Sequence, residues 1–182
     1  MTQRIVVAGP DLDELGRDVI DASLLHGEFV LSSGATSSYY LDKYLFETRP
    51  GILRRLAKAF AGHVPPDTQR IVGTELGAVA LAAALSLEID LPFVIARKVS
   101  KEYSTAKLIE GELEPGDRVV VVEDVITSGT QAIRAAERVR EAGAEVTMIL
   151  AVIDREEGGA EAMAAAGLSL TALFTRSSLA LE

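Results

Sequence analysis

Residues 119–130 combine two neighbouring carboxylates with a short stretch of hydroxyls and a glycine. Four valines precede Glu123 and Asp124, and residues 127–130 read Thr-Ser-Gly-Thr before a helical pattern. Two carboxylates can accept hydrogen bonds from a vicinal diol, such as the 2′- and 3′-hydroxyls of a ribose. Hydroxyls, backbone N–H groups and the positive end of a helix can hold one phosphate, and Gly129 lets the backbone approach that anion closely. The stretch therefore predicts a site for a phosphorylated ribose, and it is not a Walker A loop because it lacks Gly-Lys-Ser/Thr.

Residues 97–107, here called the basic loop, place several cations close together in an otherwise acidic chain. These cations are Arg97, Lys98, Lys101 and Lys107, and Tyr103 lies among them. A polar loop of this length after a predicted strand commonly has a function. Its guanidinium and ammonium groups could neutralise a diphosphate and then close over it. A solvated loop that carries charge is the alternative, and the residue types alone do not separate the two interpretations.

Two further polar segments lie near the ends of predicted strands. Residues 73–77, Gly-Thr-Glu-Leu-Gly, could expose backbone amides to a second phosphate, or they could form a simple turn between a strand and a helix. Asp154 and Arg155 directly follow the mostly apolar residues 146–153. Arg155 could bind a ligand carboxylate through two hydrogen bonds, or it could form a salt bridge with Asp154 or Glu156.

Alternating strand and helix patterns are expected to hold these polar segments in place. Runs of Val and Ile without polar alternation indicate strands that are buried on both faces, and therefore a parallel sheet covered by helices. We expect strands at residues 29–31, 39–41, 71–72, 93–96, 118–123, 146–153 and 168–174, and helices from Pro10 to Gly27 and at 50–61, 78–87, 131–141 and 159–166. In such α/β sheets ligands bind beyond the carboxyl ends of the strands, where the polar segments lie.

Length and composition indicate a single domain over residues 1–182. Hydrophobic residues make up 48% of the chain and charged residues 25%, and no apolar run reaches the roughly 18 residues of a membrane helix. Because the chain has no cysteine, disulfides and thiolate metal sites are excluded. The first residues lack the pattern of a signal peptide, so we expect a cytoplasmic protein. A net charge of −9 argues against non-specific binding to nucleic acid or to anionic membranes.

Together these segments resemble the type I phosphoribosyltransferases and, within them, the orotate phosphoribosyltransferase family. Residues 119–130 are similar to the loop that binds 5-phosphoribosyl-1-diphosphate (PRPP) in these enzymes. Residues 29–42, 97–105 and 154–155 narrow the resemblance to the orotate family. The fold implied by the resemblance is a Rossmann-like parallel sheet flanked by helices, with a small N-terminal hood at approximately residues 1–45.

The resemblance implies the transfer of ribose 5-phosphate from PRPP to orotate, which gives orotidine 5′-monophosphate and diphosphate in pyrimidine (UMP) biosynthesis. Mg²⁺ is expected to be bound mainly through PRPP, with no metal-ligating residue assigned in the protein. The transition state is expected to have oxocarbenium character, so that catalysis consists mainly of positioning and charge neutralisation. A homodimer with a shared active site is implied, because in this family the basic loop reaches the site of the neighbouring subunit.

The residue roles implied by the resemblance fall into three groups. The expected catalytic residues are Lys101, Arg97 and Asp124. The expected orotate-binding residues are Thr127 and Arg155, beneath a hood formed by residues 33–41. The expected PRPP-binding residues are Arg97, Lys98, Lys101, Tyr103, Glu123, Asp124, Val125, Ile126, Thr127, Ser128, Gly129, Thr130 and Gln131. Within this last group, Glu123 and Asp124 are expected to hold the ribose diol, and residues 127–131 are expected to hold the 5′-phosphate. Outside this group, residues 73–77 resemble the diphosphate loop of the family.

Three positions depart from the family pattern. Ser32 stands where some members have Lys, Tyr103 where some have His, and Ser104 where Gly is common. A purine-type phosphoribosyltransferase is the alternative enzyme, and Arg155 disfavours it because a purine has no carboxylate. A PRPP-binding transcriptional regulator is the other alternative, and it is disfavoured because the residues before Glu28 are acidic rather than basic.

Overall fold

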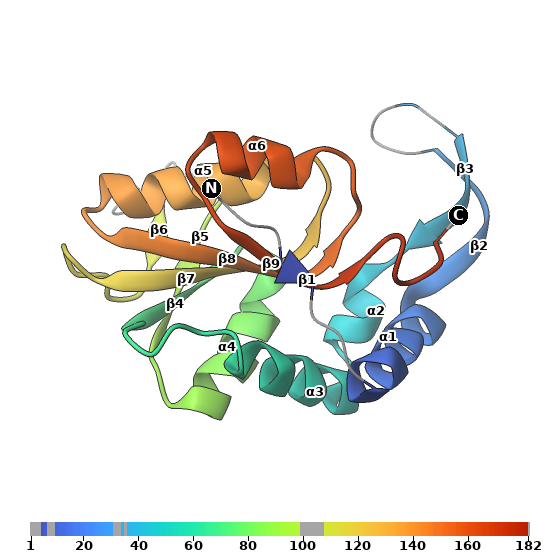
Figure 1. The fold of residues 1–182 in the computed structure, drawn as a ribbon, viewed down its shortest axis with the longest axis horizontal. Helices are drawn as coiled ribbons and strands as arrows, with labels where there is room; N and C mark the ends of the chain where they lie inside the picture. Colours follow the sequence, from blue (N-terminus) through green and yellow to red (C-terminus); the bar gives the residue numbers. More distant parts are fainter. Residues whose placement is uncertain (1–4, 7–9, 31–33, 35, 99–107, 182) are drawn as a thin grey trace.

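The computed structural model describes residues 5–6, 10–30, 34, 36–98 and 108–181. Among these residues, seven strands form one sheet in the order β1-β9-β8-β7-β4-β5-β6, and two strands form a separate hairpin (Figure 1). Neighbouring strands of the large sheet are parallel except for β5 and β6, which are antiparallel. The predicted α/β architecture with a mostly parallel sheet is therefore confirmed.

The large sheet contains β1 (Ile5–Val6), β4 (Arg70–Thr74), β5 (Phe93–Ala96), β6 (Ile109–Glu110), β7 (Arg118–Ile126), β8 (Glu145–Asp154) and β9 (Leu170–Thr175). The hairpin consists of β2 (Leu24–Val30) and β3 (Thr36–Leu41). The helices are α1 (Pro10–Ser23), α2 (Lys43–Glu47), α3 (Pro50–Ala61), α4 (Ala78–Ile89), α5 (Thr130–Glu141) and α6 (Gly159–Ala165). Figure 1 shows α5 and α6 on one face of the large sheet and α1, α3 and α4 on the other, with the hairpin extending beyond α1 and α2.

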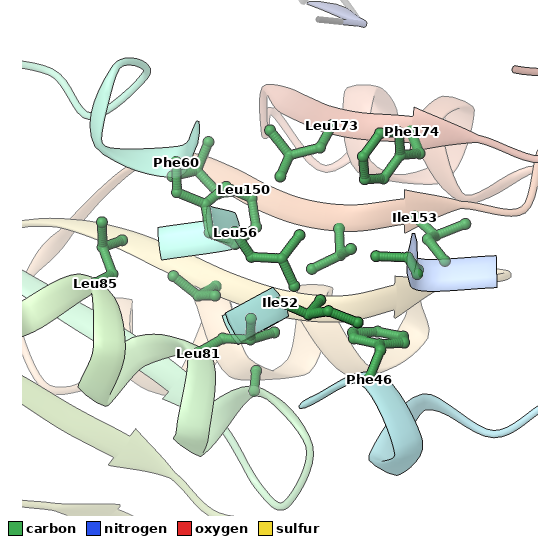
Figure 2. Packing of buried hydrophobic residues seen from close by; sticks show 14 of the residues in the cluster. Phe46, Ile52, Leu56, Phe60, Leu81, Leu85, Leu150, Ile153, Leu173 and Phe174 are labelled. Atoms are coloured by element: carbon green, nitrogen blue, oxygen red, sulfur yellow. The ribbon is translucent and has the colours of Figure 1, made fainter. Parts of the chain in front are cut away.

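Two apolar clusters lie on the two faces of the large sheet, and β7 contributes to both. Val120 and Val122 pack with side chains of α1, α3 and α4, whereas Val119 and Val121 pack with side chains of α5 and α6. The pleat of a strand sends successive side chains to opposite faces, so a run of valines is buried on both sides. Figure 2 shows part of the first cluster, to which α2 contributes Phe46.

Helix α1 ends at Ser23, so the predicted helix from Pro10 to Gly27 is too long. Leu24 and the residues after it pair with β3 instead, with Leu24 opposite Leu41 in an antiparallel ladder. The helical spacing of apolar residues continues past Ser23, but pairing with a later strand determines the backbone conformation there. Local periodicity does not reveal such a partner.

Strand β7 ends at Ile126 rather than at the predicted position 123, because β8 pairs with it as far as Ile126 opposite Asp154. Glu123 and Asp124 therefore lie within the strand and not at its end. Elements β1, β6 and α2 are not predicted by the sequence, since each has only two to five residues and shows no periodic pattern. None of the described helices has the length and apolar character needed to cross a membrane.

Candidate active site

The carboxyl ends of four adjacent strands bring the polar segments together at one edge of the sheet. Strands β8, β7, β4 and β5 are neighbours in that order and are parallel, so the segments that follow them lie side by side. Hydrogen bonds join these segments. The Arg155 N–H donates to the Ile126 carbonyl oxygen at 2.8 Å, and the Lys98 N–H donates to the Glu75 carboxylate at 2.9 Å. Ligands of α/β proteins bind at this edge.

A hollow of about 190 Å³, here called the phosphate hollow, lies at the start of α5 and is lined by Glu123 and residues 125–132. Gly129 caps α5 with a φ of 75°, a left-handed conformation that favours glycine. A Cβ at this position would also lie 3.0 Å from the carbonyl oxygen of Gly159. The exposed hydroxyls of Ser128 and Thr130 lie 2.9 Å apart. This combination of a helix start, hydroxyls and a tightly packed glycine fits the binding of a phosphate.

Glu123 and Asp124 are consecutive in β7, and the pleat of the strand sends them to opposite faces of the sheet. Glu123 lines the phosphate hollow and accepts a hydrogen bond from the Thr74 hydroxyl. Burial, followed by the negative charge of Asp124, raises the pKa of Glu123 to about 7. The Asp124 side chain is only 3% exposed, and its Oδ2 lies 2.6 Å from Nζ of Lys43. One carboxyl of the pair thus lies beside the hollow, and the other forms a buried ion pair.

Helix α2 brings Lys43 and Glu47, which were not among the predicted site residues, to Asp124. The two side chains are four residues apart and therefore lie on the same face of the helix. Burial, followed by the negative charge of Asp124, raises the pKa of Glu47 to about 9, so this carboxyl is protonated at neutral pH. The side chain of Asp42 caps α2 by accepting the Tyr44 N–H at 3.1 Å. In the sequence, a short helix of this kind is indicated by an Asp at the capping position, followed by two ionisable residues that are four positions apart.

Within residues 73–77, Gly77 packs tightly against the same carboxylate and Gly73 packs against α4. A Cβ on Gly77 would overlap Oδ2 of Asp124 and would lie 3.1 Å from Oε1 of Glu47. A Cβ on Gly73 would lie 2.7 Å from a side-chain carbon of α4. Close packing therefore requires glycine at both positions. The phosphate binding predicted for this segment is a separate role.

The described part of the basic loop comprises Arg97 and Lys98. The predicted site residues that lie outside the described residues are Lys101, Tyr103, Ser104 and Lys107 in this loop and Ser32 and Ser33 in the hood. The Arg97 guanidinium forms an ion pair with Glu110 at 3.2 Å. Arg138 of α5 donates hydrogen bonds to the carbonyl oxygens of both Arg97 and Lys98. The start of the basic loop is therefore tied to the helix that carries the phosphate hollow.

Arg155, directly after β8, lies beside the hairpin of β2 and β3. Its guanidinium carbon is 5.9 Å from the centre of the Tyr39 ring, and its Nη2 is 3.0 Å from a carboxylate oxygen of Glu157. Arg155 thus forms a salt bridge with Glu157, whereas the partners predicted for such a bridge are Asp154 or Glu156. A guanidinium has five N–H donors, so this ion pair leaves others for a ligand. Tyr40, the neighbour of Tyr39, packs instead against Phe29, with ring centres 5.6 Å apart.

Comparison with known proteins identifies the family. A phosphoribosyl transferase domain model matches residues 51–166, which is more than half of the chain. The chain is 53% identical over 153 residues to an orotate phosphoribosyltransferase of Halobacterium salinarum, with 84% of this chain and 87% of that protein covered. It is 48% identical to the orotate phosphoribosyltransferase of Natronomonas pharaonis, with 90% and 96% covered. The chain belongs to the orotate phosphoribosyltransferase family.

Solved structures agree with this family and with its fold. The Mycobacterium tuberculosis H37Rv orotate phosphoribosyltransferase in complex with Fe(III) dicitrate has a TM-score of 0.81 and 32% identity, with 94% of this chain and 100% of that chain covered. An adenine phosphoribosyltransferase of Trypanosoma brucei has a TM-score of 0.76 at 15% identity, with 100% and 87% covered, which shows a shared fold alone. The predicted family and fold are thus confirmed, while the roles of individual residues stay predictions.

Proposed function

We propose that this chain is an orotate phosphoribosyltransferase, which transfers ribose 5-phosphate from PRPP to orotate in pyrimidine biosynthesis. The observation that carries the proposal is the placement of Arg155 and the phosphate hollow after the neighbouring strands β8 and β7, at one edge of the sheet. The hollow suits a phosphate and the guanidinium suits a carboxylate. PRPP brings the first group and orotate brings the second. Membership in the family supports the same assignment.

The ribose 5-phosphate part of PRPP is proposed to lie along the end of β7. Residues 127–131 would bind the 5′-phosphate through N–H groups and hydroxyls, favoured by the positive end of α5. Glu123 and Asp124 would accept hydrogen bonds from the ribose hydroxyls. Each carboxylate oxygen has two lone pairs, so Asp124 can accept a ribose hydroxyl while it remains paired with Lys43. A ribose held at both ends presents its anomeric carbon to the base.

The reaction exchanges one bond at that carbon. The bond to diphosphate breaks, and a bond to a ring nitrogen of orotate forms. Arg97, Lys98 and Lys101 are proposed to neutralise the negative charge of the departing diphosphate, with the amides of residues 73–77 on its other side. Tyr103 is proposed to contact PRPP from the same loop. Because this loop serves the neighbouring subunit in the family, we propose a homodimer with a shared active site.

Mg²⁺ is proposed to bind together with PRPP and would supply positive charge to the diphosphate. Among the described residues, no group of three or more His, Asp or Glu side chains is arranged to hold a metal ion. Asp124 already has the ammonium of Lys43 as its cation. These residues fit an ion held mainly by PRPP oxygens and water, with Glu123 and Asp124 acting on it through the ribose hydroxyls.

Two further predictions accompany this proposal. We propose a single phosphoribosyltransferase domain over residues 1–182, with a hood at approximately residues 1–45 that covers the base. We also propose that the chain acts in the cytoplasm on small-molecule substrates. A purine-type activity is the weaker candidate, because Arg155 would then face a base without a carboxylate.

Incubation of the purified protein with PRPP, Mg²⁺ and one base at a time tests the proposal. Orotate is expected to cause diphosphate release and to yield orotidine 5′-monophosphate, whereas adenine, hypoxanthine and guanine are expected to leave PRPP unchanged. Consumption of a purine without consumption of orotate would contradict the assignment.

Replacement of Arg155 separates the recognition of orotate from that of PRPP. Arg155→Gln is expected to raise the KM for orotate about 10-fold or more, because charge-assisted hydrogen bonds to the orotate carboxylate are lost. The KM for PRPP is expected to stay close to that of the parent. Arg54→Gln, on the exposed side of α3, is the matched control for the loss of one guanidinium. Equal changes in both KM values would argue against orotate binding by Arg155.

A further inference from the structure

Lys43 follows the hairpin of β2 and β3 in the chain and contacts Asp124, which lies within β7. Its Nζ lies 2.6 Å from Oδ2 of Asp124, and its side chain is 32% exposed. We propose that Lys43 is a positioning residue that holds the Asp124 carboxylate in place for the ribose of PRPP and thereby links the hood to the PRPP site. This inference rests on the proposed function, because it gives Lys43 a part in the binding of PRPP.

Helix α2 is fixed at both ends, so it presents Lys43 in a defined place. At its start, the Asp42 N–H donates to the carbonyl oxygen of Ser23 in α1 at 2.9 Å, and the Asp42 carboxylate caps the helix. Near its end, Phe46 is fully buried in the core between the sheet and α3 (Figure 2). Although α2 has only five residues, it is thus anchored by a cap and by a core side chain.

The Asp124 carboxylate is confined on several sides. Oδ1 accepts the N–H of Val125, and Oδ2 is paired with Lys43. The backbone of Gly77 lies so close that a Cβ there would overlap Oδ2. Lys43 is the one of these contacts that comes from a flexible side chain and can be removed without a change in the backbone. Its loss is therefore expected to release the carboxylate from its position.

Charge gives Lys43 a second effect on the same carboxylate. The described titratable side chains that interact with Asp124 are Lys43 and Glu47 from α2 and Glu123, its neighbour in β7, while the start of α4 offers the uncharged Gly77. Lys43 is the only cation among these described groups. Burial raises the pKa of both glutamates, which shows how costly a further negative charge is here. Lys43 therefore offsets the negative charge around the carboxylate that it contacts.

The same short stretch of chain also reaches the proposed orotate site. Tyr39 of β3 contacts Arg155, and Lys43 at the start of α2 contacts Asp124. A movement of this stretch would therefore displace side chains in both proposed substrate sites. Lys43 connects the part of the molecule that covers the base to the part that holds the ribose.

Calorimetric titration of PRPP with Mg²⁺, in the absence of any base, tests this inference. Lys43→Met removes the charge and keeps most of the length, and its Kd for PRPP is expected to rise about 10-fold or more. The loss is expected to deepen from about pH 8 to about pH 6.5, because the charge of Lys43 lowers the pKa of Glu123, which is about 7, and removal of the ammonium raises it. Lys43→Arg keeps the charge and is expected to recover most of the affinity. Lys58→Met, on the exposed face of α3, controls for the loss of one lysine.

A folded Lys43→Met protein with the affinity and pH dependence of the parent would overturn the inference. Equal losses in Lys43→Met and Lys43→Arg would overturn it as well. If circular dichroism shows that Lys43→Met does not fold, the double variant Lys43→Met/Glu47→Gln removes a carboxyl together with the ammonium. The loss of PRPP affinity in this double variant is again expected to deepen from about pH 8 to about pH 6.5, and the absence of this pH dependence overturns the inference. A parent protein without orotate-dependent diphosphate release would contradict the proposed function, which is a separate outcome.

Discussion

Glu123 and Asp124 are neighbours in the chain but lie in different surroundings. Glu123 faces the phosphate hollow and accepts a hydrogen bond from a hydroxyl, whereas Asp124 lies on the other face of β7 in an ion pair with Lys43. Because side chains alternate along a strand, two consecutive side chains point to opposite faces of the sheet and contact different elements. Glu123 is held by Thr74 of β4, and Asp124 is held by Lys43 in the segment that follows the hood hairpin. The two carboxylates of this acidic pair are therefore positioned by different parts of the molecule.

The largest effect is expected on the Asp124 side, from Gly77→Ala. The new Cβ would overlap Oδ2 of Asp124, so the carboxylate has to move away from Lys43. We expect kcat/KM for PRPP to fall about 10-fold to 100-fold, because overpacking of a tight site costs about 1–3 kcal/mol. Gly51→Ala in α3, where nothing lies within 4 Å of the new Cβ, is the matched control. Steady-state kinetics of both variants checks the prediction, and similar kinetics in the two would contradict it.

A smaller effect is expected on the Glu123 side, from Gly129→Ala. Both Gly129 and Gly158 cap helices with a positive φ, of 75° and 88°, so alanine at either position strains the backbone by about 1–2 kcal/mol. Only at Gly129 would the Cβ also crowd its neighbours, at 3.0 Å from the Gly159 carbonyl oxygen. We expect both variants to lose stability in urea unfolding, and Gly129→Ala alone to lose PRPP affinity, by about 10-fold. An equal loss of PRPP affinity in Gly158→Ala would mean that strain, and not the shape of the hollow, is responsible.

The smallest effect on PRPP kinetics is expected from Glu47→Gln, because its main effect concerns stability. The pKa of Glu47 is raised from 4.5 to about 9 in the folded protein. Between these values the unfolded chain has released the proton and the folded chain has kept it, so the free energy of unfolding falls as pH rises, by up to about 1.4 kcal/mol per pH unit. Because glutamine does not ionise, the variant is expected to be more stable than the parent, by a margin that grows from about pH 5 to about pH 8.5.

Urea unfolding at several pH values measures that margin. Glu14→Gln, at an exposed position of α1, is the matched control and is expected to show no growing margin. A margin for Glu47→Gln that shrinks as pH rises would mean that Glu47 is ionised in the folded protein.

The phosphate hollow and the parallel sheet could be predicted because local residues determine them. The run of valines in β7 indicates burial on both faces, and Gly129 within Thr-Ser-Gly-Thr indicates a turn into a helix. The positions of most strands and helices follow from the same kind of local pattern. Arg155 could likewise be placed at the sheet edge, because it directly follows an apolar strand.

The partners of Asp124 could not be predicted, because they depend on tertiary contacts. Lys43 reaches Asp124 only because Phe46 anchors α2 in the core, and a five-residue helix has too few positions to show a periodic pattern. The end of α1 at Ser23 is missed for a similar reason, since the strand that pairs with the next residues comes later in the chain. The raised pKa of Glu47 follows from burial beside Asp124, which no spacing of residues in the sequence reveals.

A crystal structure of this chain with PRPP and Mg²⁺ bound is the most direct test of the proposed site. We predict the 5′-phosphate within hydrogen-bond distance of residues 127–131, and the ribose hydroxyls at Glu123 and Asp124, with Lys43 still paired to Asp124. A phosphate bound outside the hollow at the start of α5, or a ribose that contacts neither carboxylate, would contradict the assignment.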